Sequence, residues 1–481
     1  MPQIQFLDFY TILPYIILTV WACLLLVVDL FIPRDRKSIT AFLAALGMAV
    51  ALAYAIAQIG FPASTGFNNM VALDSFSTFA NVLLLASGLF GVALAHGYIK
   101  RMGIERGEYY VLLLFSLTGM MLMAQANDLI IVFLALELLS IPLYVLSALA
   151  RKAQSEEAGL KYFLLGAFSS GFLVYGIALI YGATGTTSLN NIFYAASSGD
   201  FSLLLTIGAA LVLVGFAFKV AAVPFHMWTP DVYHGAPTSI TAFMAAGAKI
   251  AGFVSLFRVF TVAFPALAPD MTGILWALSA LTMIVGNLLA ISQGNIKRML
   301  AYSAIAHAGY ILMAFVPYGN KDVASTAIAA GLFYLVAYSL ANFGSWGVVI
   351  AIEKAEGRGI EISDFAGLAK KYPVLAAAMT VFMLSFIGFP PTLGLVGKFY
   401  LFRSVIEGGF TGLAIIGVVT SLISAYYYLR VVVNMYMKDG EPSAASEFWL
   451  DASTITTAVA TVAVSLVPQF LFLLASTAVM R

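Results

Sequence analysis

Four charged side chains lie deep inside long apolar segments of this sequence. Glu137 stands in IIVFLALELLSIPLYVL, Lys219 in LVLVGFAFKVAAV, Lys249 in TAFMAAGAKIAGFVSLF and Lys398 in GLVGKFYLF. If these segments cross a membrane, each charge costs roughly 2.5–3.5 kcal/mol at the helix centre. Because charges retained at that cost mark functional sites by default, these four residues are the first candidates for chemistry.

Lysine and glutamate in an apolar environment are suited to proton transfer. Desolvation disfavours the charged form of both side chains, and a neighbouring opposite charge restores it. Forming and breaking a pair between Glu137 and Lys219 would therefore make the lysine bind and release a proton. Lys249 and Lys398 would carry the proton further along the path. The alternative is that these charges form static ion pairs that lock helices together.

Four further residues could extend this proton relay, namely Lys161, His226, His234 and His307. Histidine titrates near neutral pH without assistance. An inert role stays open for each of them. Lys161 is close to a helix start and could extend to the membrane surface. His307 could be a neutral side chain hydrogen-bonded between helices, and His226 and His234 could be ordinary loop or cavity residues.

Other polar and aromatic residues are expected to be structural. His96 and Lys297 lie near the expected membrane edges, where we expect them to be interfacial. The run Tyr426-Tyr427-Tyr428 is more typical of packing than of a cofactor site.

The composition places these residues in a membrane protein. Hydrophobic residues make up 62% of the 481 positions and charged residues 10%, against about 45–50% and ~25% in soluble domains. The net charge of +1 does not favour nucleic acid as a partner. The one cysteine cannot hold an iron–sulfur cluster or a structural zinc ion. No nucleotide-binding glycine motif is present, so we expect no redox centre and no cofactor in this chain.

Apolar segments separated by short polar breaks predict an all-α polytopic membrane protein with about fourteen transmembrane helices. No polar stretch is long enough for a soluble domain, which predicts one transmembrane domain over residues 1–481. The expected spans are 11–32, 39–60, 76–99, 109–126, 128–150, 158–182, 201–223, 236–260, 271–292, 296–317, 324–352, 373–406 (interrupted), 411–437 and 452–477. Fifteen of the 24 Lys and Arg residues lie in the loops after odd-numbered spans or at the edges of those loops. The positive-inside rule then places those loops in the cytoplasm and both termini outside.

Two expected spans are interrupted in similar ways. Span seven continues AFKVAAVPFHMWTPD, with a lysine before a proline, and span twelve contains FIGFPPTLGLVGKF, with paired prolines before a lysine. Interrupted helices at corresponding places in two halves indicate an inverted-repeat transporter. We expect a first repeat over residues 108–264, a second over 270–438, and flanking helices in 1–107 and 439–481.

Four sequence motifs resemble those of the antiporter-like subunits of respiratory complex I, and most closely the subunit N branch of bacterial NADH-quinone oxidoreductase. The most specific is KVAAVPFHMWTPDVYHGAPTSITA, residues 219–242. The supporting motifs are NDLIIVFLALELLSIPLYVL, NIKRMLAYSAIAHAGY and GFPPTLGLVGKF. The resemblance covers essentially the whole chain. Lys398 argues against the subunit M branch, which usually has glutamate there, and His234 departs from the common subunit N pattern.

The resemblance implies a fold of fourteen helices with two inverted five-helix repeats and broken helices seven and twelve. It implies that Glu137, Lys219, Lys249 and Lys398 carry protons from the cytoplasm to the outside, with Lys161 and His307 matching further family positions. It also implies a bacterial inner-membrane complex with M-type and K-type neighbours. NAD, FMN, iron–sulfur clusters and quinone are expected in partner subunits, and quinone reduction there would drive pumping. A cation/proton antiporter subunit and a passive membrane scaffold remain as alternatives.

Overall fold

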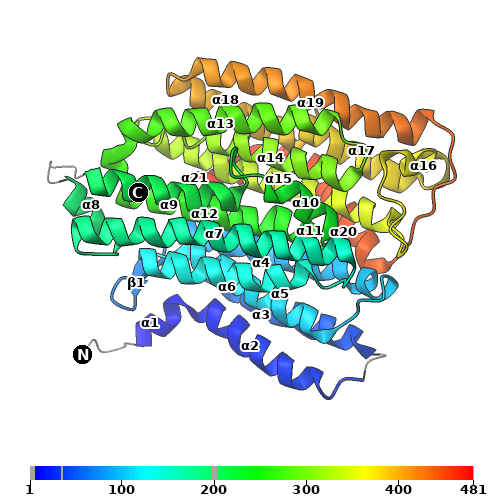
Figure 1. The fold of residues 1–481 in the computed structure, drawn as a ribbon, viewed down its shortest axis with the longest axis horizontal. Coiled ribbons are helices and arrows are strands. Elements are labelled where there is room, and N and C mark those ends of the chain that lie inside the picture. The colour runs from blue at the N-terminus through cyan, green and yellow to red at the C-terminus, as the bar shows by residue number, and fades with distance from the viewer. Residues whose placement is uncertain (1–5, 34–35, 198–202, 480–481) are drawn as a thin grey trace.

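The computed structural model describes residues 6–33, 36–197 and 203–479, and it is almost entirely helical (Figure 1). The first half contains helices α1 (Phe6–Thr11), α2 (Leu13–Asp29), α3 (Ser38–Ala57), α4 (Ser75–Arg101), α5 (Gly107–Gln125), α6 (Leu129–Ser147), α7 (Ala153–Thr184), α8 (Leu189–Ser197), α9 (Leu203–Val220), α10 (Trp228–Gly235), α11 (Thr238–Phe243) and α12 (Lys249–Ala263). The second half contains α13 (Ala268–Ile291), α14 (Ile296–Met313), α15 (Ala324–Ile352), α16 (Leu368–Lys371), α17 (Pro373–Ile387), α18 (Leu393–Glu407), α19 (Thr411–Met437), α20 (Phe448–Leu466) and α21 (Pro468–Ala478). Short strands β1 (Ser64–Gly66) and β2 (Val71–Leu73) form an antiparallel hairpin.

The predicted membrane-helix architecture is confirmed. Within the described residues, eleven helices are long and apolar enough to cross a membrane, and α2, α17 and α21 are shorter apolar helices. Each predicted span coincides with one of the helices or with a broken pair, although residues 201–202 of span seven lie outside the described part of the chain. Most of the long helices run side by side, with α2 at one edge of the molecule and α18 and α19 at the opposite edge (Figure 1). The α-class assignment from composition therefore holds.

The last predicted span differs from the continuous helix that we expected. It is divided into α20 and α21, and the break falls at Val467, whose backbone (φ −132°, ψ 62°) is not helical. Pro468 is the first residue of α21, and proline at that position needs no backbone donor and fits the first turn of a new helix. The hydropathy pattern did not reveal this break because both sides of it are apolar.

The two predicted breaks are present and their backbone groups find partners. Helix α9 ends at Val220, and the freed Phe218 carbonyl accepts hydrogen bonds from the Trp228 indole (3.0 Å) and the Ala221 amide (3.0 Å). Helix α17 ends at Ile387, followed by Gly388 with φ +86°, a left-handed conformation that glycine adopts without strain. An unwound backbone inside a membrane protein is tolerated because such partners replace the lost helical bonds.

Close helix contacts place α14 in the middle of the second half. A Cβ atom on Gly286 of α13 would lie 2.6 Å from the Ala306 nitrogen, and one on Gly309 of α14 would lie 2.7 Å from the Met283 nitrogen. Glycine therefore lets these two helices approach, as is usual where lipid provides no hydrophobic driving force. Helices α11, α12 and α14 are buried along nearly their whole length, and they carry or contact the candidate residues.

Candidate proton-relay site

The three central lysines are buried in the interior of the helix bundle. Lys219 on α9, Lys249 at the start of α12 and Lys398 on α18 are 4%, 3% and 3% exposed. Glu137 on α6 is partly buried. In the part of the chain that the structure describes, no ion pair joins any of these three lysines to an acid. Each ammonium group is held instead by hydroxyl or carbonyl oxygens.

Lys219 contacts hydroxyl groups rather than Glu137. Its Nζ atom donates to Ser140 Oγ at 2.8 Å and to the Tyr162 hydroxyl at 3.3 Å. Glu137 Oε1 accepts a hydrogen bond from Ser170 Oγ on α7. The expected direct pair of Glu137 and Lys219 is therefore not formed in this structure.

A small cavity lies between these two groups. Its wall includes Ser140, Ser169, Ser170, Tyr144 and Lys219, and it has room for about one water molecule. Hydroxyl groups donate and accept hydrogen bonds. The hydroxyls in this wall therefore place donors and acceptors beside both the serine that binds Glu137 and the ammonium of Lys219.

The segment 219–242 packs against the Lys219 site through Trp228. The Trp228 ring stacks on Tyr162, with ring centroids 4.6 Å apart and an interplanar angle of 6°. Tyr162 in turn holds the Lys219 ammonium over its ring, 5.6 Å from the centroid. Trp228 thus caps the end of α9 and also positions the tyrosine that contacts the lysine.

Lys249 follows a one-turn π-helix, Met244–Ala248, that interrupts the α11–α12 segment. Its Nζ atom donates to the Ala304 carbonyl on α14 and lies 5.3 Å from the centre of the Tyr338 ring. Single π turns inside α-helices are frequent at functional sites. This one sets the register with which Lys249 projects from its helix.

Lys398 occupies the break of the second half. Its Nζ atom donates to the carbonyls of Phe386 (2.8 Å) and Ile387 (2.9 Å) at the end of α17, and to Ser421 Oγ on α19 (2.7 Å). The final carbonyls of a helix lack helical partners and carry the negative end of the helix dipole. A cation is therefore stabilised at the point where α17 unwinds.

His307 lies on α14 between the contacts of Lys249 and Lys398. Along α14, Ala304 binds Lys249, His307 follows one turn later, and Tyr310 lies 4.5 Å under the Lys398 ammonium one turn further on. His307 Nδ1 bonds the Tyr334 hydroxyl (2.7 Å) and Nε2 bonds the Tyr428 hydroxyl (3.1 Å). The histidine therefore joins α14 to α15 and α19 midway between two buried lysines.

Lys161 has a different environment from the central lysines. Its side chain is 41% exposed and forms ion pairs with Glu157 and Asp231, both at 2.7 Å. Asp231 also binds Arg298 of α14 at 2.8 Å. Asp231 thus links α7, α10 and α14, and the sequence interpretation gave it no role.

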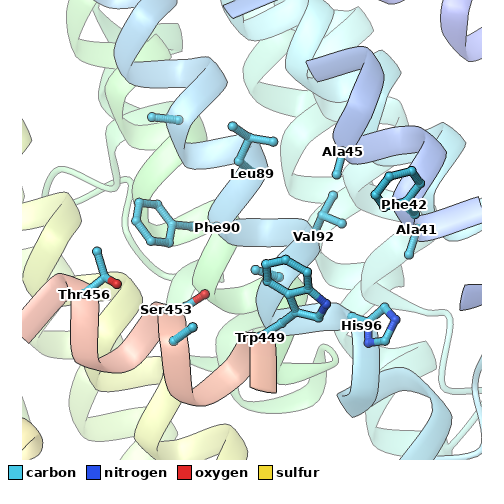
Figure 2. Close-up of a pocket in the computed structure, with 13 residues that line it drawn as sticks. Ala41, Phe42, Ala45, Leu89, Phe90, Val92, His96, Trp449, Ser453 and Thr456 are labelled. Atoms are coloured by element: carbon cyan, nitrogen blue, oxygen red, sulfur yellow. The ribbon is translucent and has the colours of Figure 1, made fainter. Parts of the chain in front are cut away.

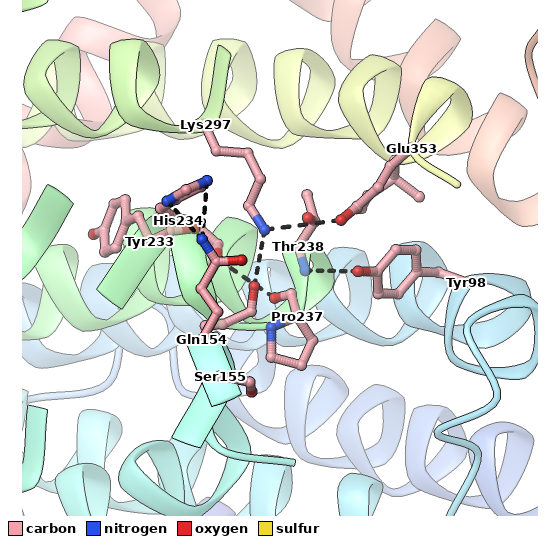
Figure 3. A network of polar contacts seen from close by, with 12 residues as sticks. Tyr98, Gln154, Ser155, Tyr233, His234, Pro237, Thr238, Lys297 and Glu353 are labelled. Atoms are coloured by element: carbon pink, nitrogen blue, oxygen red, sulfur yellow. Dashed lines mark hydrogen bonds and ion pairs between the residues drawn. The ribbon is translucent and has the colours of Figure 1, made fainter. Parts of the chain in front are cut away.

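His234 and Lys297 belong to a second polar cluster near the junction of α10 and α11 (Figure 3). Lys297 is 3% exposed, more buried than an interfacial residue, and its Nζ atom donates to the Ala236 carbonyl at 2.9 Å. Glu353 Oε1 lies 3.9 Å from Lys297 Nζ. His234 Nδ1 faces the Gln154 amide nitrogen at 3.1 Å, and because an amide nitrogen only donates, this ring atom accepts.

His226 lies in the break between α9 and α10. It is half-buried, and its Nδ1 atom is buried and unpaired among the described residues.

Several residues of the site escaped the sequence interpretation because they are neutral. Ser140, Ser170, Tyr310, Tyr338 and Tyr428 carry no charge and therefore do not stand out in an apolar segment. One signal was available: Ser421 and Tyr428 are seven residues apart, which places them on one face of α19. The structure gives Tyr428 a polar role, because its hydroxyl contacts both His307 and Ser303.

The described residues contain no group of three or more His, Cys, Asp or Glu side chains placed to hold a metal ion. The site consists of amines, one carboxylate, one imidazole and many hydroxyls. This arrangement can move protons between fixed groups.

Comparison with known proteins identifies the same architecture elsewhere. The family model described as NADH:quinone oxidoreductase/Mrp antiporter, TM, matches residues 126–424. NADH-quinone oxidoreductase subunit N from Trichlorobacter lovleyi is 48% identical over 91% of this chain and 89% of its own length.

Solved structures agree with this result. A chain of respiratory complex I from Thermus thermophilus is 35% identical, with a TM-score of 0.82, over 96% of this chain and 99% of that one. A chain of the Mrp complex from Dietzia sp. superposes with a TM-score of 0.88 over 98% of this chain and 97% of that one. Its identity of 22% is a likeness of fold alone.

Proposed function

This chain belongs to the NADH:quinone oxidoreductase/Mrp antiporter membrane-subunit family, in its subunit N branch, and from that premise we propose that it translocates protons. The proposed path runs from the Glu137 and Lys219 site through Lys249 and His307 to Lys398. The observation that carries this proposal is the burial of three lysines without acidic partners in direct contact. A lysine held only by neutral oxygens gives up its proton at lower cost than one in an ion pair.

In the first half of the path, we infer that Glu137 controls the charge of Lys219. The structure corresponds to the separated arrangement, in which Glu137 binds Ser170 and Lys219 binds Ser140. A water molecule in the cavity between them would complete the connection. Approach of the carboxylate would favour protonated Lys219, and its withdrawal would favour release.

In the second half, His307 connects two lysines. Lys249 and Lys398 contact α14 one turn before and one turn after the histidine, about 4.5 Å along the axis in each direction. The hydroxyls of Tyr334 and Tyr428 bind both ring nitrogens, so that a proton gained on one side can leave on the other. His226 and His234 are proposed as secondary groups near the first break.

We also propose a direction and an energy source, namely outward proton movement driven by quinone reduction in partner subunits. The loop charges support a cytoplasmic position for the loops after odd-numbered spans, with both termini outside. The similarity to bacterial subunit N supports a bacterial inner membrane, and we propose that protons move across it from the cytoplasm outward. We propose that NAD, FMN, iron–sulfur clusters and quinone belong to partner subunits, and that M-type and K-type membrane subunits adjoin this chain.

The five-helix repeats remain part of the proposal. Residues 108–264 contain five spanning units in which the fourth is the broken α9–α10 pair, and residues 270–438 contain five in which the fourth is the broken α17–α18 pair. The flanking segments 1–107 and 439–481 contribute α1–α4 and α20–α21. This matching order supports two related halves, each with one buried lysine beside its break.

A substitution that keeps the charge but prevents proton release tests the proposal. Arginine is never deprotonated in proteins, so an assembled complex with Lys249→Arg is expected to lose proton uptake as fully as Lys249→Met. The measurement is proton uptake with NADH-driven quinone reduction in vesicles, after assembly has been checked by co-purification. Full-rate uptake by either variant would overturn the relay.

The two alternative functions have less support. A passive scaffold needs its buried charges to be paired, and the three lysines are not paired with acids among the described residues. A cation/proton antiporter is supported by the likeness to a chain of the Mrp complex. At 22% identity, that likeness is evidence for the fold and not for the function.

A further inference from the structure

A long apolar groove lies between α3, α4 and α20, away from the proton-relay residues (Figure 2). It encloses about 490 Å³, and its walls include Phe42, Leu89, Phe90 and Trp449. Alanines on all three helices line it and leave the space between the larger side chains open. The groove therefore offers an apolar channel of the kind that covers a hydrocarbon chain.

A second groove continues the first along α4. Ala86 lines both, and the second groove ends near Gln58, Asp74 and Ser75 beside α21. From His96 at one end to Ser75 at the other, α4 advances about 31 Å at ~1.5 Å per residue. This length matches the ~30 Å hydrocarbon core of a bilayer, so that each groove corresponds to one leaflet.

One end of the first groove carries polar groups for which the described residues show no hydrogen-bond or ion-pair partner. His96 and the Trp449 indole lie at the same end of the groove (Figure 2), and Lys100 follows His96 by one turn on the same face of α4. The described residues provide no ion-pair partner for the exposed Lys100 ammonium. The neighbouring Arg101 is already neutralised by Glu447 at 2.5 Å.

The far end of the second groove, at Asp74, has no unpaired cation among the described residues that line it. Asp74 lines it, and its carboxylate binds Arg258 at 2.7 Å. Gln58 and Ser75 are uncharged polar residues at that end, and the described residues that line the second groove include no lysine or arginine. An anionic headgroup thus has an unpaired cation at one end only.

We propose that the groove between α3, α4 and α20 binds an anionic phospholipid, with an acyl chain between Phe42 and Leu89 and the phosphate at Lys100, His96 and Trp449. Basic residues at the cytoplasmic end of membrane helices attract anionic lipids, and tryptophan is enriched at the headgroup level. A phospholipid matches both parts of the site, because acyl chains suit the apolar walls and a phosphate pairs with the exposed Lys100 ammonium. This inference does not depend on the proton relay.

Photocrosslinking in the assembled complex tests the site. The complex is placed in phosphatidylcholine nanodiscs that contain a photoreactive phosphatidylglycerol, and the labelled peptides are identified by mass spectrometry. Label is expected on α4 and α20 near residues 89–96 and 449–456. Excess phosphatidylglycerol should compete with the label and excess phosphatidylcholine should not.

Matched variants separate the charge from the groove. Lys100→Gln is expected to lower the labelling about fivefold, as for the loss of one basic residue near a membrane surface. Ala93→Phe, which fills the first groove, should remove the label, and Val82→Phe in the second groove should leave it unchanged. Equal competition by both lipids, labelling unaffected by Ala93→Phe, or crosslinks from this groove to another subunit would overturn the proposal. Proton uptake serves as the independent readout of the relay.

Discussion

The two broken helices of this chain solve the same structural problem with different groups. At the first break, the Trp228 indole and a backbone amide satisfy the Phe218 carbonyl, and Lys219 is left to contact Ser140 and Tyr162. At the second break, Lys398 itself binds the freed carbonyls of α17. Lys219 thus lies beside a break whose backbone carbonyl is hydrogen-bonded by other groups. Lys398, in contrast, is itself the donor to the carbonyls at its break.

This difference assigns different tasks to the two sites. The first lysine has an acid nearby, Glu137, which can change the stability of its charged form without disturbing the helix end. The second contacts no acid among the described residues, so its charge is stabilised by the helix end and by Ser421. We therefore expect Glu137 to control the charge of Lys219 at the first break. At the second break, we expect loss of the proton from Lys398 to weaken the end of α17.

Removal of either lysine is expected to have the largest effect. Lys219→Met and Lys398→Met should each lower proton uptake about 100-fold, the usual contribution of a proton-transfer group. Only Lys398→Met should also destabilise the subunit, by roughly 1–3 kcal/mol, because buried carbonyls lose their donor. Uptake in vesicles and thermal unfolding of the purified complex measure the two effects. The exposed Lys370→Gln is the matched control, and equal loss of stability in both lysine variants would remove the distinction.

Exchanging the charges at the first break tests whether their order matters. The double variant Glu137→Lys with Lys219→Glu keeps one acid and one lysine at this site but places the acid on the wrong helix for the relay. We expect proton uptake to fall at least about tenfold, a change that corresponds to ~1.4 kcal/mol in a barrier. Retention of full pumping in this variant would favour a scaffold.

Of the adjacent residues Tyr427 and Tyr428, the one that bonds His307 should matter more for proton uptake. Tyr428→Phe removes the hydroxyl bonded to Nε2 and should slow uptake about threefold to tenfold, as for one lost hydrogen bond of ~0.5–1.5 kcal/mol. Tyr427→Phe removes a hydroxyl that bonds Asn287 at 2.9 Å and makes no hydrogen bond to His307 among the described residues, and it should leave uptake nearly unchanged. Stopped-flow uptake with both variants decides this, and identical rates would place the path away from His307.

The smallest effect is expected at Lys161. Its half-exposed ion pairs are worth about 0.2–1 kcal/mol, and Lys161→Gln should change uptake by less than about twofold. Asp231→Asn should behave similarly, although it also frees Arg298. If Lys161→Gln abolishes uptake as Lys219→Met does, Lys161 belongs to the relay itself.

The charged residues of the site could be predicted from the sequence, and its neutral features could not. Glu137, Lys219, Lys249 and Lys398 stood out because a charge in an apolar segment is conspicuous whatever the tertiary structure. The breaks after Lys219 and before Lys398 were visible as prolines and glycine. The division of the last span at Val467 and the π turn before Lys249 were not, since neither changes the hydropathy of its segment.

The sequence by itself determined that the chain lies in a lipid bilayer, how many membrane helices it has and which charged residues lie in them. It could do so because a bilayer imposes one rule on every segment, and that rule depends only on local composition. The tertiary structure alone decided what each charge contacts, since Lys219 meets Ser140 across 79 positions and Lys249 meets Ala304 across 55. Hydrogen bonds depend on distance and direction in space, and helix packing brings together groups whose separation along the chain carries no such information.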